Sequence, residues 1–279
     1  MQRRSFFVLT ALAFGFAFLY VPILSMVLFS FNESKLVTVW AGFSTKWYVS
    51  LFSNDQMLDA ARLSLQIASI NATGAVILGT VAGLVLARFG RFKGRTILSG
   101  MTTAPLVMPE VITGLSLLLL FVAMEQLFGW PQGRGVTTIT LAHITFSMAY
   151  VTVVVQSRLT TFDESLEEAA MDLGARPAKV FFVITLPIIL PAIISGWLLA
   201  FTLSWDDLVI TSFVSGPGST TLPMLIFSKV RLGVSPEINA LATILVLIVT
   251  IGIVGSAIWM QRQERNRQRD VQMAKAANE

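Results

Sequence analysis

Ionisable side chains are rare in the long apolar stretches of this 279-residue sequence, and most of those present are acids. Glu110 follows two prolines, and Asp206 and Asp207 directly follow Trp205. Ionisable groups in such surroundings are costly, which makes them candidates for function. Carboxylates beside an aromatic face suit a cationic ligand, because they offset the ammonium charge while the ring adds cation–π attraction. We therefore predict a pathway for a cationic substrate, lined by Glu110, Trp205, Asp206 and Asp207.

The two aspartates also have a structural interpretation, in which they bond to nearby hydroxyl groups or to a neighbouring helix and only fix packing. Thr202, Ser204 and Thr211 are close enough in sequence to serve as partners. Adjacent residues of a helix point about 100° apart, so both carboxylates are not expected to face one pore. Of the two, we favour Asp207 as the residue that faces the pathway.

Glu110 lies in a segment that contains Pro105 and Pro109. Each proline removes a backbone donor, and the freed carbonyl groups must be satisfied by protein or by a water-filled cavity. This favours a broken helix that lines the pathway. The alternative is a simple kink with Glu110 near the membrane interface.

Metal and nucleophile chemistry are not favoured by the sequence. It has no cysteine, so it has no thiolate ligand, no cysteine nucleophile and no disulfide. His143 is the single histidine and has no other expected ligand in its apolar stretch. We predict that His143 is a hydrogen-bonded packing residue, and we assign neither a metal site nor a catalytic residue.

The composition indicates that lipid is the solvent of most of the chain. Hydrophobic residues make up 54% and charged residues 13% of the sequence, whereas soluble domains carry about 25% charged residues. Apolar stretches of about 20 residues cross a bilayer as helices. Six such stretches predict an all-α polytopic membrane protein with six transmembrane helices, at residues 6–31, 63–87, 97–124, 136–155, 188–214 and 239–260.

The basic residues predict the orientation of these helices. If both termini are cytoplasmic, most of the 20 Lys and Arg residues fall on the inner side, as the positive-inside rule expects. The tight basic cluster from Arg88 to Arg95 then lies in a short inner turn, where it meets anionic membrane lipid. We therefore expect a multi-pass membrane protein, and no nucleic-acid partner despite the net charge of +4.

The same topology divides the chain into four segments. We predict an N-terminal cytoplasmic tip with the first helix at residues 1–31 and a periplasmic loop at residues 32–62. A core transmembrane domain at residues 63–260 contains a cytoplasmic loop at residues 158–187, and a basic cytoplasmic tail covers residues 261–279. In the periplasmic loop, aromatic residues are expected to anchor the chain at the membrane interface, namely Trp40, Trp47 and Tyr48.

The loop at residues 158–187 is expected to form a helical pair. Residues 163–173 contain strong helix formers with acids in the first turn, and Gly174 follows as a helix end. Pro177 suits the first turn of a second helix. Small residues, Ala169 and Ala170, would let another protein approach closely. A helix lying on the membrane would instead carry Lys and Arg on its polar face.

The spacing of the residues in this loop resembles the EAA loop of bacterial ABC importer permeases. The sequence has Glu168-Ala169-Ala170, then Gly174, and then Ile184-Thr185-Leu186-Pro187. The resemblance extends to the spermidine/putrescine subgroup over nearly the whole chain, in FNESKLVTVWAGFSTKWY, APLVMPEVITGLSLLLLF, SWDDLVI and GPGSTTLPM. At the position of Glu110 related polyamine permeases commonly have aspartate, which leaves fine specificity open.

The resemblance implies a type I ABC importer permease fold, a location in the bacterial inner membrane and a set of partners. The loop would form coupling helices in a groove of a separate ATPase, with Glu168, Ala169, Ala170 and Gly174 at the contact. The partners would be a second homologous permease, two ATPase subunits and a periplasmic polyamine-binding protein. The sequence has no Gly-Lys-Ser/Thr phosphate loop, so ATP and Mg²⁺ would bind to the ATPase, and this chain would be a translocation subunit and not an enzyme.

The implied function is uptake of putrescine, spermidine or both. Three alternatives are a permease of this kind for another small solute, a secondary transporter driven by an ion gradient, and an intramembrane enzyme with paired aspartates. The absence of an internal repeat disfavours the second, and the divergence of adjacent aspartates disfavours the third.

After the fifth stretch, Gly216-Pro217-Gly218 predicts a turn. Residues 222–227 are apolar but too short to cross the membrane, and they are expected to fold back near the outer mouth.

Overall fold

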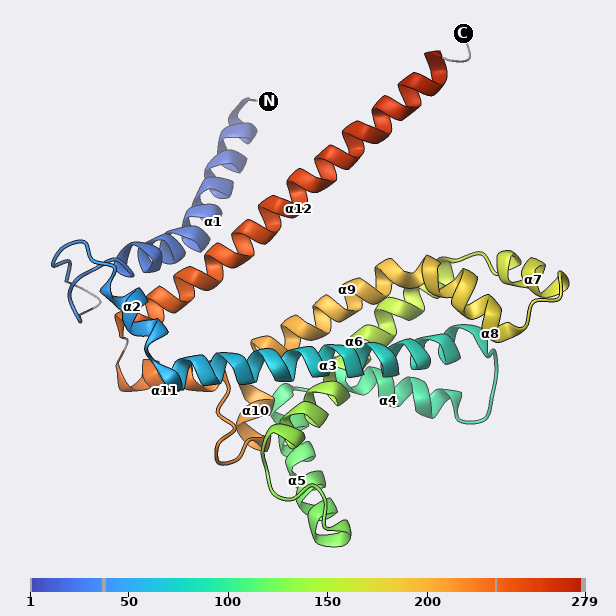
Figure 1. The fold of residues 1–279 in the computed structure, drawn as a ribbon, viewed down its shortest axis with the longest axis horizontal. Coiled ribbons are helices and arrows are strands. Elements are labelled where there is room, and N and C mark those ends of the chain that lie inside the picture. Colours follow the sequence, from blue (N-terminus) through green and yellow to red (C-terminus); the bar gives the residue numbers. More distant parts are fainter. Residues whose placement is uncertain (1, 37–38, 234, 277–279) are drawn as a thin grey trace. The chain divides into compact units, whose positions relative to one another are not determined.

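The computed structural model describes residues 2–36, 39–233 and 235–276, and within these ranges most of the chain is helical (Figure 1). The chain divides into two compact units. One comprises Met1–Asp55 and Lys229–Glu279, and the other comprises Gln56–Ser228. The predicted all-helical membrane architecture is therefore confirmed for the described residues.

The first unit contains α1 (Gln2–Phe29), α2 (Lys46–Phe52) and α12 (Pro236–Ala276), and α12 contacts both others. Two of the three aromatic residues predicted to anchor this region at the interface are used inside the loop itself. The indole Nε1 of Trp47 donates to the carbonyl oxygen of Asn32 at 2.7 Å, and the Tyr48 hydroxyl lies 2.7 Å from Ser30 Oγ. Trp40 remains 47% exposed.

The remaining helices lie between these elements in the sequence. They are α3 (Asp55–Arg88), α4 (Arg95–Val107), α5 (Glu110–Phe128), α6 (Val136–Thr161), α7 (Ser165–Asp172), α8 (Pro177–Val180), the π-helical turn η1 (Phe181–Thr185), α9 (Leu186–Trp205), α10 (Val209–Val214) and α11 (Leu222–Leu232). The helix α3 begins at Asp55, so the second half of the predicted loop at residues 32–62 is helical.

Helix α6 is the centre of the second unit. One buried cluster joins it to α3, α5 and α10, and another joins it to α3 and α9. Small residues allow the close approach of α3 and α6, as is common for helices in membranes. A Cβ atom on Gly79 would lie 2.7 Å from Cβ of Val151 and 3.0 Å from the Met148 carbonyl oxygen. This position therefore requires glycine.

All six predicted apolar stretches fall on helices, but two of them are not continuous. Among the described residues, five helices are long and apolar enough to cross a membrane, and Pro236–Gly252 is a shorter apolar one. The stretch at 97–124 is divided between α4 and α5, because Met108 and Pro109 adopt extended backbone with ψ of 138° and 135°. The stretch at 188–214 is divided between α9 and α10.

Candidate functional site

The interruption between α9 and α10 contains both aspartates of the predicted pathway. The helix α9 ends at Trp205, and α10 begins at Val209. Our expectation that Asp206 and Asp207 lie inside one continuous helix is therefore wrong. The physical reason is that the Asp207 carboxylate supplies acceptors for the free backbone N–H groups of a new helix, which hydropathy does not reveal.

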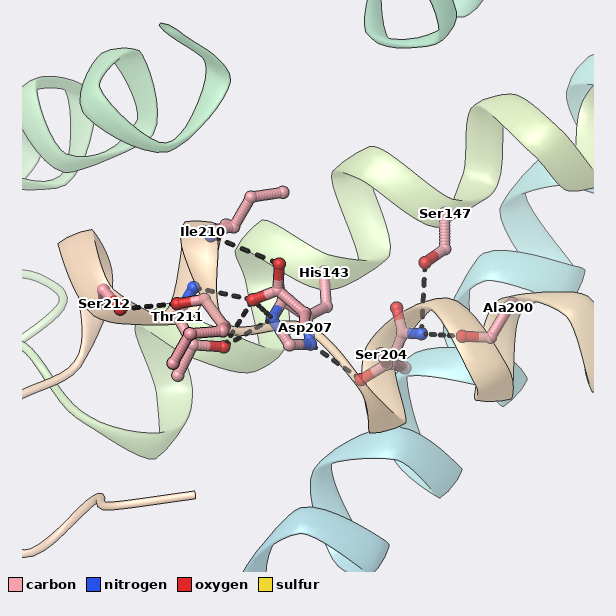
Figure 2. Close-up of polar contacts among 10 residues, drawn as sticks. His143, Ser147, Ala200, Ser204, Asp207, Ile210, Thr211 and Ser212 are labelled. Carbon is pink, nitrogen blue, oxygen red and sulfur yellow. Dashed lines mark hydrogen bonds and ion pairs between the residues drawn. The ribbon is translucent and has the colours of Figure 1, made fainter. Parts of the chain in front are cut away.

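The contacts of Asp207 are drawn in Figure 2. Its Oδ1 accepts a hydrogen bond from the backbone N–H of Ile210 at 3.2 Å. Its Oδ2 accepts from the backbone N–H of Thr211 at 2.7 Å and from the Thr211 hydroxyl at 2.6 Å. The side chain of Asp207 is 8% exposed. Asp207 thus caps the first turn of α10.

His143 connects α6 to both sides of this interruption (Figure 2). Its Nδ1 lies 2.7 Å from Ser204 Oγ, in the last turn of α9. Its Nε2 lies 3.0 Å from Thr211 Oγ1 and 3.2 Å from Asp207 Oδ2. His143 is 3% exposed, so it is a buried, hydrogen-bonded residue whose partners belong to the interrupted segment.

A second polar contact holds α9 one turn earlier. The side-chain amide of Asn71 in α3 donates to the carbonyl oxygen of Ala200 at 2.8 Å and lies 3.2 Å from Ser147 Oγ of α6. Asn71 is fully buried. Interhelical hydrogen bonds of this kind, together with close packing, hold helices together in a membrane. The end of α9 is therefore fixed from two sides.

The two adjacent aspartates have different environments. Asp206 is exposed, whereas Asp207 is engaged by His143 and α10. Their divergence agrees with our expectation. Asp206 is the exposed acid of the pair, and Asp207 holds the start of α10.

An aromatic row on α9 leads to Asp206. The rings of Trp197 and Phe201 have centroids 5.4 Å apart, and those of Phe201 and Trp205 are 6.0 Å apart. All three side chains are partly exposed. A carboxylate at the end of a row of exposed aromatic rings can attract an ammonium group, and the rings can cover the methylene chain attached to that group.

Glu110 lies at the start of another interrupted helix. It is exposed in the first turn of α5, after Pro109 at the N-cap. The segment is thus a broken helix and not a simple kink. The helices α5 and α10 are packed together, since a Cβ atom on Gly114 would lie 3.3 Å from Cα of Ile210. The structure therefore packs the second turn of α5 against α10 and leaves Glu110, one turn earlier in α5, exposed.

The predicted helical pair at residues 158–187 is present as α7 followed by α8 (Figure 1). The backbone N–H of Ser165 donates to Asp163 Oδ1 at 3.0 Å, which lowers the pKa of the Asp163 carboxyl, and the Ser165 hydroxyl adds to this effect. Asp163 therefore stays ionised at neutral pH and holds the turn that starts α7. Gly174 has a φ of +84°, as a helix end formed by glycine requires.

Three residues predicted for the ATPase contact are open to solvent. Glu168, Ala169 and Gly174 are exposed, and Ala170 is partly exposed. No side chain of α7 is buried. The helix is therefore available to a partner. Sequence reasoning missed the contacts that hold α7 to the rest of the unit, which come from Arg88, Glu164, Glu167 and Thr185.

No group of three or more His, Cys, Asp or Glu side chains suited to a metal ion occurs in the part of the chain that the structure describes. The single histidine is instead occupied by hydroxyl and carboxylate partners.

Comparison with known proteins places this architecture in a family. Residues 79–269 match the family described as the binding-protein-dependent transport system inner membrane component. The chain belongs to this family. It is therefore a membrane-spanning transport component of the inner membrane, which confirms the predicted localisation and decides against the ion-gradient transporter.

Named relatives cover nearly the whole chain. It is 64% identical over 274 residues to the putrescine transport system permease protein PotI of Escherichia coli (strain K12), covering 98% of this chain and 97% of that protein. It is 41% identical over 257 residues to the spermidine/putrescine transport system permease protein PotC of the same strain, covering 92% of this chain and 94% of that protein. The resemblance to this subgroup is thereby confirmed.

Solved structures support the fold. A chain of a bacterial ABC transporter involved in the import of the acidic polysaccharide alginate superposes with a TM-score of 0.69 at 16% identity, covering 92% of this chain and 96% of that one. A chain of the MetNI methionine ABC transporter superposes with a TM-score of 0.57, also at 16% identity, covering 72% and 94%. At this level of sequence identity, these similarities show that the chain has the ABC importer permease fold, and they show nothing about its substrate.

Proposed function

We propose that this chain is one of two permease subunits of an ATP-driven importer that carries polyamines, putrescine among them, into the cytoplasm. The observation that carries the proposal is the exposed Asp206 at the interruption between α9 and α10, next to Trp205 and the aromatic row. The similarity to PotI over nearly the full length of both proteins supports the same substrate class.

The chemistry of a polyamine matches this arrangement. Each ammonium group loses hydration when it enters the pathway, and a carboxylate about 4 Å away returns about 1 to 4 kcal/mol at effective dielectric constants of 80 to 20. The methylene chain between the charges has no polar group, so it is suited to the aromatic surface of α9. A carboxylate without such a surface would serve an inorganic cation as well.

The proposal assigns the energy source to partner subunits. Two ATPase copies would bind ATP and Mg²⁺, and α7, with Glu168, Ala169, Ala170 and Gly174, would dock on one of them. A second permease would complete the pathway, and a periplasmic binding protein would deliver the substrate. The exposed surface of α7, which lacks any buried side chain, supports this docking role.

Reconstitution tests the function directly. The four components are purified and placed in proteoliposomes, and uptake of labelled putrescine is measured with and without ATP. We expect that uptake requires ATP, the ATPase and the binding protein. If spermidine is also a substrate, unlabelled spermidine should compete with labelled putrescine and reduce its uptake. Uptake by this chain alone under an ion gradient, or uptake that an excess of unlabelled polyamine leaves unchanged, would contradict the proposal.

A further inference from the structure

The helix α7 is held to its own unit by polar contacts instead of by packing. None of its side chains is buried. Behind it lies a hollow of about 360 Å³, bounded by the end of α3 and by α8 and η1, whose lining includes Leu84, Phe89, Met171 and Phe181. A helix displaces its neighbours through the contacts that it makes with them. The polar contacts beside this hollow join α7 to α3 and η1, so they can carry a displacement of α7 to those helices.

Arg88 is the last residue of α3 and makes the first of these contacts. Its Nη1 lies 2.5 Å from Glu164 Oε1, and its Nε lies 3.1 Å from Glu167 Oε2. The guanidinium group also lies 5.6 Å from the ring centroid of Phe162. The side chain is only 12% exposed. Its Nη1 donates a hydrogen bond to Glu164, whereas its contact with Glu167 is an ion pair, and Nε and Nη2 are buried without a hydrogen bond.

Glu167 makes a second contact with its other carboxylate oxygen. Oε1 accepts a hydrogen bond from the hydroxyl of Thr185, which is 2% exposed. Thr185 is the last residue of η1, and α9 follows it without a break. One carboxylate of α7 thus links the end of α3 to the beginning of α9. Single π-helical turns are frequent at functional sites, where helix geometry is locally altered.

The two acids that contact Arg88, Glu164 just before α7 and Glu167 within it, are not equivalent. The side chain of Glu164 is 61% exposed, whereas that of Glu167 is 15% exposed. An exposed ion pair is screened by water and salt and contributes little. Glu167 also has the additional partner in η1, which Glu164 lacks. The link to the transmembrane helices therefore depends on Glu167.

We propose that Arg88, Glu167 and Thr185 form a clamp that transmits movement of α7 to α3 and α9 during transport. The clamp rests on the proposed function, since it requires that α7 be moved by a docked ATPase. The far end of α9 carries Trp205 and the interruption with Asp206. A displacement of α7 that reaches Thr185 is thus applied to the helix that presents the substrate contact. Arg88, Glu167 and Thr185 are positioning residues in this scheme.

The first experiment substitutes Glu167 in the reconstituted importer. Glu167→Gln keeps the size of the side chain but removes its charge from Arg88. We expect putrescine uptake to fall about ten-fold while ATP hydrolysis and subunit assembly persist, as a coupling free energy of ordinary size would give. Thr185→Val, which keeps the volume and removes the hydroxyl, should act in the same direction. Glu164→Gln is the matched control and should change uptake less than about two-fold.

A second experiment restores the link covalently. Because the chain contains no cysteine, Arg88→Cys and Glu167→Cys can be combined and bridged by a short bis-methanethiosulfonate reagent that thiols remove. The unbridged double variant should hydrolyse ATP without uptake. Bridging should return uptake, and reduction should abolish it again. The unsubstituted chain treated with the same reagent is the control for cysteines of the partners.

The outcomes separate the clamp from a merely structural contact. Normal uptake in Glu167→Gln would overturn the clamp. The clamp would also be overturned if the double cysteine variant lost uptake, hydrolysis and assembly together and bridging did not restore them. Uptake that returns on bridging supports it, even where the unbridged variant assembles poorly. A failure of the proposed function is recognised separately, because the unsubstituted complex would then show no ATP-dependent uptake.

Discussion

The adjacent aspartates of the interrupted segment provide a matched test, because the same chemical change at two neighbouring residues should have opposite consequences. Asp207→Asn is expected to weaken the fold and leave substrate affinity nearly unchanged. Asp206→Asn is expected to weaken substrate affinity and leave the fold unchanged. The reason is that the Asp207 carboxylate is 8% exposed and bonded within the unit, whereas Asp206 is exposed.

The effect of Asp207→Asn follows from its contacts. The carboxylate accepts two backbone N–H groups and the Thr211 hydroxyl, and it lies 3.2 Å from Nε2 of His143. An amide keeps one acceptor oxygen and turns its NH₂ group toward a backbone donor. Hydrogen bonds to charged groups contribute about 1 kcal/mol more each than those between neutral groups. We expect a loss of about 2 to 3 kcal/mol, which is roughly 5 to 10 °C in Tm for a chain of this size.

The effect of Asp206→Asn follows from its charge. If an ammonium group approaches within about 4 Å in partly hydrated surroundings, the pair is worth about 1 to 2 kcal/mol. Loss of the charge should then raise the KM for putrescine about five- to thirty-fold at an unchanged Tm. The amide retains the shape of the side chain, so packing around α9 should not change.

Both quantities can be measured on one preparation. Fluorescence-detected size exclusion after heating gives the Tm of the assembled complex, and initial uptake rates in proteoliposomes give the KM. The reasoning is refuted if Asp207→Asn raises the KM at a normal Tm, or if Asp206→Asn lowers the Tm at a normal KM. The first result would restore Asp207 as the residue that faces the pathway.

Three further outcomes are expected. His143→Leu, which leaves Ser204 and Asp207 without their ring partner, should destabilise the complex by about 1 to 3 kcal/mol in thermal melts, and His143→Gln should destabilise it less. Gly79→Leu should force α3 away from α6 and reduce assembled protein in size exclusion, at a cost of about 1 to 3 kcal/mol, whereas Gly15→Leu, with nothing within 4 Å, should not. Gly174→Val should retain insertion but uncouple ATP hydrolysis from uptake, because φ of +84° strains a branched residue, and Gly174→Asn should be milder.

Several features of the fold could be predicted because their signals are local. Each apolar stretch is long enough to cross a bilayer, and all six lie on helices of the structure. The acids, Gly174 and Pro177 predicted α7 and the start of α8 to within a few residues. The second helix does not end before the next span, however, because α8 continues through η1 into α9. Capping and turn chemistry act over one helical turn, so a single sequence contains them.

The interruptions of two transmembrane segments were only partly predictable. Two prolines near Glu110 gave a local signal for the separation of α4 and α5. No such signal precedes Asp206, where the sequence reads as an uninterrupted apolar helix with two acids inside it. There the helix ends because Asp207 caps a new helix and His143, 64 positions earlier in the chain, holds both sides. A contact of that separation cannot be recognised from periodicity.

Composition, hydropathy and short-range spacing were enough to predict that this protein lies in the membrane, which segments are apolar helices of about the length needed to cross it, and which loop is suited to a partner. Only the tertiary structure decided which of two adjacent aspartates is accessible and which contacts hold α7. The physical reason is that both answers depend on side chains brought together by helix packing, Asp207 with His143 and Glu167 with Arg88 and Thr185. Residue type alone gives each of these acids the same charge, and the surroundings assign the role.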